Sequence, residues 1–333
     1  MTAATDKMIQ AIEYVVKPIS IGTNLALLHV IWAMVSGAFL LSRGAVHTAL
    51  KLSGRTDEEA RRGGAALRTG QWQIKELIDR WREWVLKQEG WEVKKYEGWR
   101  AVSCDVVVFP RLKLNNWVAK LYRGTFGRAV KAVGIGVIVD VGQYAGERVP
   151  LLKKLIRCQN VEDAEAQLKH DLLKAGATLL GENGVLVHDA GATIKDMQKV
   201  KAKRYIVRLA SNCVARWSYL PENAHGNRQY GNLLRPLARS RQGKEIASTK
   251  DPTETTSFEH DGHIIQVQRW RNVVSVDVKV SDEAETYDIW VFLTRAIVSH
   301  LSWVLILTPR PQPFTNSILT DGLLSSCPWP PSK

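Results

Sequence analysis

Two aspartates occupy apolar stretches of the chain, where a carboxylate is unfavourable unless it has a binding partner. Asp105 interrupts the run Ala101–Phe109 (AVSCDVVVF), and Asp189 ends the run Gly184–Asp189 (GVLVHD). A carboxylate in such a strand is costly unless it meets a cation or a hydrogen-bond donor. Two strands side by side would bring both carboxylates to one divalent ion, for which magnesium is the natural candidate. Asp105 and Asp189 are therefore candidate metal ligands.

A second interpretation stays open for both acids. Each could cap a turn or face solvent at a strand end, and Asp189 could do so easily. Asp140 is a rival at the end of its own strand, but Val141 and Gly142 follow it and mark a turn. Spacing alone does not choose between a metal pair and solvent-facing strand ends.

A group of cations follows Asp189 in the chain. Basic side chains dominate the affinity of proteins for the DNA backbone, so these residues are candidate phosphate contacts. The alternative for any one of them is a solvated charged face. The group consists of Lys199, Lys201, Lys203, Arg204 and Arg208.

The overall charge points in the same direction. The 333 residues carry a formal net charge of +13, which suits a polyanionic partner such as nucleic acid or an acidic membrane surface. The four cysteines are scattered without the spacing of a zinc site or a disulfide framework, which favours a reducing cytoplasm. None of the eight histidines has a convincing nucleophile partner.

One segment is apolar enough to raise the question of a membrane span. Ile21–Leu41 contains no charged residue and is long enough to cross a bilayer. It also contains Asn24, His29 and Gly37, and it stands alone in the chain. A buried helix is the favoured interpretation, with a membrane span as the alternative.

Periodicity predicts the elements that position the candidate residues. From Gln71 to Gln88, apolar residues recur at helical spacing, and Gly90 ends that helix. A short helix is expected after Asp189. The remaining predictions are strands at Ala101–Phe109, Lys131–Val141, Gly184–Asp189 and Arg204–Leu209, and a helix at Asn160–Ala175.

The composition and the periodicity of the sequence change after Trp217. A polar, turn-rich stretch leads into the alternating runs HIIQVQRW and VSVDVKV, which predict a β-rich insertion in a mixed α/β core. The last residues, from Arg310 to Lys333, are rich in proline and nearly uncharged, unlike an ordinary disordered tail. The expected parts are a helical N-terminal region, a first part of the core, the insertion with a return to the core, and an anomalous tail: 1–98, 99–216, 217–290 and 291–333.

The order of these motifs resembles the DDE-type transposases of insertion sequences. The resemblance covers about residues 100 to 293, and the helical N-terminus resembles that family's end-binding region. It implies an RNase H-like mixed sheet flanked by helices, with one acid on the first strand and another on the fourth. Asp105 takes the first role and Asp189 the second. Val106 and Ala192 depart from the residues that are common beside these acids.

The family's third acid lies in the signature Tyr-x2-Arg-x3-Glu-x6-Lys, which does not occur after Asp189. Translation of the tail one nucleotide out of register, with permitted third bases, converts Ile318–Lys333 into YTDRWPVEQLPLAAKQ, which contains that signature. Its tyrosine, arginine, glutamate and lysine fall at Ile318, Asp321, Ser325 and Ser332. The sequence therefore predicts a frameshift near Leu293 and Thr294, and a non-native stretch from Thr294 to Lys333.

The resemblance implies an enzyme that binds the inverted terminal repeats of its element in double-stranded DNA, as a homodimer. It would cut and join DNA with two Mg²⁺ or Mn²⁺ ions held by three acids. With two acids, this chain is expected to be inactive, in a bacterial cytoplasm and on the nucleoid when bound to DNA. The alternatives are a DNA-binding remnant that inhibits transposition and a membrane-anchored basic protein.

Overall fold

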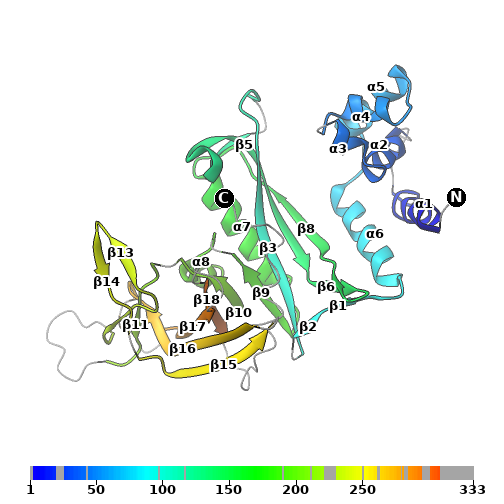
Figure 1. Cartoon of the computed structure of the whole chain (residues 1–333). Coiled ribbons are helices and arrows are strands. Elements are labelled where there is room, and N and C mark those ends of the chain that lie inside the picture. Colours follow the sequence, from blue (N-terminus) through cyan, green and yellow to red (C-terminus); the bar gives the residue numbers. More distant parts are fainter. Residues whose placement is uncertain are drawn as a thin grey trace. The chain divides into compact units, whose positions relative to one another are not determined.

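The computed structural model divides the chain into two compact units, shown in Figure 1. Unit 1 comprises Met1–Glu92 with Gly142–Lys154, and unit 2 comprises Val93–Val141 with Leu155–Lys333. The structure describes residues 3–19, 26–42, 44–96, 98–115, 118–189, 191–210, 212–220, 230–249, 251–260, 263–278, 280, 284–294 and 301–307. Residues 295–300 and 308–333 of the anomalous tail, with all four slots of the displaced signature, lie outside the described residues.

Unit 1 is a helical bundle with a small sheet. Thr56 begins α5 with a capping box: its side chain accepts from the backbone N–H of Glu59, and the Glu59 carboxylate accepts from the N–H of Thr56. β1 (Trp91–Val93), β6 (Gly142–Tyr144) and β7 (Glu147–Arg148) form the sheet. The helices are α1 (Ala3–Val16), α2 (Ala26–Val35), α3 (Ala38–Leu41), α4 (Val46–Leu52), α5 (Asp57–Thr69) and α6 (Ile74–Lys87).

The apolar segment Ile21–Leu41 contains two short helices. α2 has 10 residues, about 15 Å of helix, against the roughly 30 Å of a bilayer core. Leu27, Val30 and Ala33 of α2 are buried within unit 1. No helix in the described part of the chain has the length and apolar content that a membrane span requires.

A mixed sheet organises unit 2. β3 (Trp99–Pro110) pairs antiparallel with β5 (Arg128–Asp140) on one side and parallel with β9 (Gly184–His188) on the other. β9 in turn pairs parallel with β10 (Arg204–Arg208). Beyond β5 lie β4 (Ala119–Arg123) and β8 (Leu151–Arg157), which both pair with it. The chain is thus a mixed α/β protein, and the strands predicted before residue 210 form.

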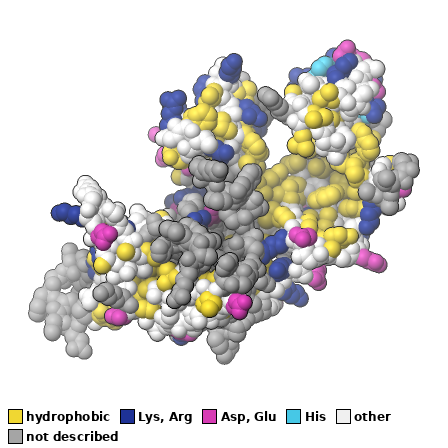
Figure 2. Space-filling model, in the orientation of Figure 1, with side chains coloured by type: hydrophobic (Ala, Val, Ile, Leu, Met, Phe, Trp, Pro, Cys, Tyr) yellow, Lys and Arg dark blue, Asp and Glu magenta, His cyan; other side chains and the backbone are white. Residues whose placement is uncertain are grey.

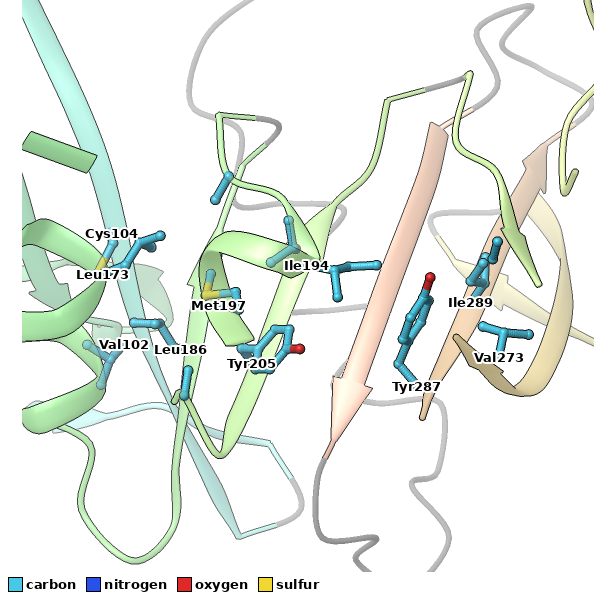
Figure 3. Close-up of a cluster of buried hydrophobic side chains, with 14 of the residues drawn as sticks. Val102, Cys104, Leu173, Leu186, Ile194, Met197, Tyr205, Val273, Tyr287 and Ile289 are labelled. Atoms are coloured by element: carbon cyan, nitrogen blue, oxygen red, sulfur yellow. The ribbon is translucent and has the colours of Figure 1, made fainter. Parts of the chain in front are cut away.

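Two helices cover one face of this sheet. α7 (Ala164–Thr178) packs on β3, β4 and β5, and α8 (Ile194–Lys199) packs beside α7. Gly134 and Gly136 of β5 permit the close approach, because a Cβ on Gly136 would lie 3.0 Å from the Leu172 side chain. Figure 3 shows the core between helices and sheet, where the helices contribute Leu173, Ile194 and Met197 and the sheet contributes Val102, Cys104, Leu186 and Tyr205.

The region after Trp217 is β-rich, as expected, and continues the main sheet. The run HIIQVQRW lies in β16 (His263–Ser275), which pairs with β11 (Ala215–Trp217), β15 (Glu254–His260) and β17 (Tyr287–Thr294). The prediction of a strand at VSVDVKV is wrong beyond Ser275. The N–H of Val278 donates to the carbonyl of Ser275 in a turn, and the Asp277 carboxylate binds Lys195.

The stretch expected to be non-native differs from that expectation in part. Residues Leu301–Leu307 form β18, which pairs antiparallel with β10 and β17 and so joins the insertion to the core sheet. The run LSWVLIL is uncharged and apolar, and such a run pairs with open strand edges whatever its origin. The backbone of 301–307 is therefore part of the sheet.

We expect Leu172→Ala in α7 to lower the free energy of unfolding by about 2–5 kcal/mol, because Leu172 is 0% exposed and its removal leaves a cavity. Chemical denaturation followed by circular dichroism measures this change. The matched substitution Leu112→Ala, at a leucine that is 56% exposed, should stay within about 0.5 kcal/mol. Equal losses for both variants would contradict the packing of α7 on the sheet.

Candidate functional site

Parallel pairing of β3 with β9 brings the two candidate acids to neighbouring positions. Cys104 of β3 and His188 of β9 are partners across the strands, and Asp105 and Asp189 follow them directly. Adjacent strands lie about 4.8 Å apart, so the backbones of the two acids are neighbours. The predicted adjacency of these acids on one mixed sheet agrees with this register.

Both carboxylates lie on the same face of the sheet. Cys104 belongs to the core under α7, so strand alternation directs Asp105 to the opposite face. On β10, Val207 belongs to that core, and Arg208 points away from it by the same alternation. The Asp189 carboxylate contacts Arg208, and so lies on the Asp105 side. We call this face of β3, β5, β9 and β10, opposite α7 and α8, the acid face.

The acids of the acid face are exposed, and their partners are few. Oδ1 of Asp105 accepts the N–H of Val106 at 2.7 Å. Asp189 has a 58% exposed side chain, and its Oδ1 lies 3.4 Å from Nη1 of Arg208. Sequence reasoning proposed Arg208 as a phosphate contact and missed this ion pair, which neutralises part of the charge that would attract a metal.

The donor set fits one divalent ion better than two. Two exposed carboxylates on one face provide oxygen ligands for one hydrated Mg²⁺, which keeps several waters in its shell. A two-metal site requires a third carboxylate to balance the charge of the ions. Among the described residues, no group of three or more metal-ligating side chains is close enough to bind an ion. The described residues therefore do not fit the two-metal arrangement.

Asp140, the rival acid, faces the other way. It is the register partner of Val102, which belongs to the core under α7. Because paired residues of neighbouring strands share a face, Asp140 lies on the helix side of the sheet, opposite to Asp105. It is not a third acid for this pair.

The predicted basic residues separate into two places. Lys199, Lys201 and Lys203 are exposed at the connection from α8 into the start of β10. Arg208 lies at the other end of β10, four residues beyond Arg204 and therefore about 13 Å along the strand. The lysines thus lie away from the acids, and only Arg208 joins Asp189.

Arg204 has a structural role that sequence reasoning missed. Its Nε donates to the carbonyl of Gly184 at 2.9 Å and its Nη2 to that of Gly181 at 2.8 Å. The guanidinium also lies over the Trp99 ring, 5.3 Å from its centroid. These contacts fix the turn before β9 to β10, so the interactions of Arg204 hold strands together.

A buried histidine supports the backbone at Asp189. His188 is 4% exposed, and its Nδ1–H donates to the carbonyl of Asp189 at 2.8 Å. Its Nε2 is buried with no hydrogen-bond partner among the described residues. Burial lowers the pKa of His188 below its usual value of 6.5, although Asp189 and Asp105 act in the opposite direction.

No family model matches the sequence, and no curated protein matches it.

We expect the free energy of unfolding to fall as the pH drops below about 6.5. In the unfolded chain His188 binds a proton in this range, whereas in the folded protein its burial keeps the ring neutral. The loss reaches about 1.4 kcal/mol per pH unit and ends below the folded-state pKa of His188. His188→Gln should flatten this part of the profile in denaturation measured across pH. An unchanged slope in the variant would show that the ring is accessible to protons.

Proposed function

We propose that the chain is a transposase of the DDE type from an insertion sequence, which binds DNA and lacks strand cleavage in the present reading frame. The observation that carries the proposal is the placement of Asp105 and Asp189 at neighbouring positions of two parallel strands, on one face. A structural pair of carboxylates would gain nothing from such proximity, because like charges repel, whereas a shared cation offsets the repulsion.

The topology of unit 2 supports an RNase H-like core. The resemblance implies acids on the first and fourth strands, and β3 is the first strand of the main sheet after the short β2 (Lys95–Tyr96). If β4 is regarded as an extension of the β5 hairpin and the short β6 and β7 as parts of unit 1, then β9 is the fourth. The antiparallel pair β3–β5 and the parallel strands β3, β9 and β10 agree with a mixed sheet flanked by helices.

The missing third acid accounts for the proposed inactivity. In the resembling family, the bound metal ions activate the attacking water or 3′-hydroxyl and stabilise the leaving oxygen. Asp105 and Asp189 could hold one Mg²⁺ or Mn²⁺, while Arg208 binds one oxygen of Asp189. The family's glutamate would come from the displaced frame at the position of Ser325, outside the described residues.

Part of the acid face is exposed on β3, and this supports the frameshift hypothesis. Elsewhere on that face Val185 of β9 and Ile206 of β10 are buried in a second apolar cluster. On β3, Val107 is 38% exposed and Phe109 is 42% exposed, and both lie on the same face of the strand as Asp105. In the restored frame, a helix bearing the glutamate would pack on the sheet beside the acids and cover such side chains. The present residues cannot form that helix, because Pro328, Pro330 and Pro331 each cost about 3 kcal/mol inside one.

A DNA-binding remnant of this kind could act as an inhibitor. Occupying the terminal repeats without cutting them would exclude the intact enzyme from its substrate. If the remnant shares the dimer interface of the intact enzyme, dimers that contain one copy of each would also be inactive. The membrane-anchored alternative has less support, because α2 and α3 have 10 and 4 residues, too few to cross a bilayer.

We expect the purified chain to bind double-stranded DNA carrying an element end and to neither nick nor join it in Mg²⁺ or Mn²⁺. Gel shift and denaturing electrophoresis measure the two properties. Asp105→Asn and Asp189→Asn should bind DNA at least as well as the parent, because each removes a negative charge from the acid face. Strand cleavage abolished by either substitution would reveal a third ligand and contradict the proposed inactivity.

Restoring the reading frame by one nucleotide at the codons for Leu293 and Thr294 should yield metal-dependent cleavage. The restored chain should also unfold at a higher temperature, because the new helix covers the acid face. Glutamate-to-glutamine substitution at the restored signature is the control, since it keeps the helix and removes the ligand. A restored protein that is inactive and no more stable than the present chain would contradict the frameshift hypothesis.

A further inference from the structure

A hairpin at the free end of β5 concentrates positive charge. The stretch 106–139 contains no acidic residue, whereas six cations lie within it: Arg111, Lys113, Lys120, Arg123, Arg128 and Lys131. All six are exposed. We call residues 119–131, which comprise β4, the turn Gly124–Phe126 and the start of β5, the cationic hairpin. Figure 2 shows dark blue Lys and Arg side chains on the part of the surface around β5, where the hairpin lies.

The cations of the hairpin face one another across the strands. Lys120 is the register partner of Lys131, and Arg123 is the register partner of Arg128. Like charges directly opposite each other in an antiparallel pair destabilise it. None of the four has an ion-pair partner in the described part of the chain; Lys131 only donates to Asn115, at 3.1 Å. An arrangement that costs stability in the isolated protein suits a bound anion between the cations.

The surroundings of the hairpin do not offset this charge. Within the described part of the chain, the acid that hydrogen-bonds to the hairpin is Glu165 of α7, whose carboxylate accepts the backbone N–H of Tyr122 at 2.9 Å. That bond is made to the backbone at the outer edge of β4 and not to the cationic side chains. The positive charge is therefore presented to solvent.

Exposed aromatic side chains accompany the cations. Tyr122 is 55% exposed on β4, and Phe126 is 44% exposed in the turn. Cations that follow a phosphate backbone, together with aromatic rings on which bases stack, are the two components of surfaces that bind single-stranded nucleic acid. The hairpin carries both within 13 residues.

The hairpin continues the acid face. Leu121 and Ala132 pack under α7, so alternation places Lys120, Tyr122 and Lys131 on the opposite side. Along β5, that side leads from Lys131 to Val137, the register partner of Asp105. Six residues of strand span about 20 Å. Lys120, Lys131, Tyr122 and Asp105 thus share one surface that a DNA strand could follow. The same alternation places Arg123 and Arg128 on the α7 side of the hairpin, so the strand would meet them only beyond the tip.

We propose that the cationic hairpin binds a DNA strand, with phosphates held between the opposed cations and unpaired bases against Tyr122 and Phe126. The proposal deepens the proposed function, because it locates the DNA contact and the form of DNA preferred: a duplex with a single-stranded extension. It does not require metal binding by Asp105 and Asp189. A lipid surface is the less suitable polyanion, since Lys120 and Lys131 lie on a sheet face that continues into the fold and the arginine pair lies on the other side of the hairpin.

The first test measures the salt dependence of binding with the full chain and a fluorescent duplex carrying a single-stranded extension. Lys120→Ala should reduce the slope of log affinity against log salt by about 1. The quadruple alanine variant at Lys120, Arg123, Arg128 and Lys131 should reduce it by about 3 to 4. The matched control is Lys174→Ala, which removes an exposed cation from α7 on the other face and should leave the slope unchanged.

The second test separates binding from folding. Because the quadruple variant removes two opposed like-charge pairs, its melting temperature should equal or exceed that of the parent. Tyr122→Ala and Phe126→Ala should each weaken binding to the extended duplex about 5- to 100-fold, with little effect on a blunt duplex. A quadruple variant that melts lower would show that the opposed cations serve the fold, and would overturn the proposal.

The remaining outcomes distinguish this inference from the proposed function. If the parent binds DNA and the hairpin variants bind equally well, the hairpin inference is overturned while the proposed function stands. If the parent binds no DNA at any salt concentration, both fall. Hairpin-dependent binding to phosphatidylserine vesicles but not to the extended duplex would overturn the inference in favour of a membrane partner.

Discussion

The alternation of side chains along β3 is the constraint on which the candidate site depends. Cys104 is buried under α7, and Asp105 must therefore point to the other side of the sheet. Parallel pairing with β9 then transfers the constraint, because buried His188 is the partner of Cys104 and Asp189 follows it. A register slip of one residue would bury a carboxylate in the apolar core, so packing of α7 and position of the acids are specified together.

The sequence predicted what local pattern determines and missed what distant contacts determine. β3, β9 and β10 were predictable because each is a β-branched apolar run. That Asp105 and Asp189 are neighbours could be expected only through the resemblance, since strand order depends on pairing between remote segments. Arg204 was assigned to phosphate because its sequence neighbours are basic, yet its partner is the carbonyl of Gly184. The cationic hairpin was overlooked because its charges meet only after folding.

The end of the described chain illustrates a limit of hydrophobic pattern. β18 fills the space between β10 and β17 although the sequence there was expected to be foreign to the fold. A strand needs little more than an apolar run and open edges, whereas a catalytic helix needs a donor at one defined position. A shifted frame can therefore supply sheet structure by composition alone, while the chemistry of the original frame is lost.

The opposed cations of the hairpin also bear on association between copies of the chain. β4 ends the main path of the sheet, and its outer edge, apart from the Tyr122 N–H that Glu165 accepts, offers backbone donors and acceptors to another strand. A second β4 that paired there would add its own Lys120 and Arg123 to charges already facing one another. This repulsion reaches about 10 Å at 0.1 M salt and about 3 Å at 1 M. At low ionic strength, charge repulsion would thus prevent a second strand from pairing with the outer edge of β4. Concentrated salt would screen that repulsion and favour strand-to-strand aggregation of the purified protein.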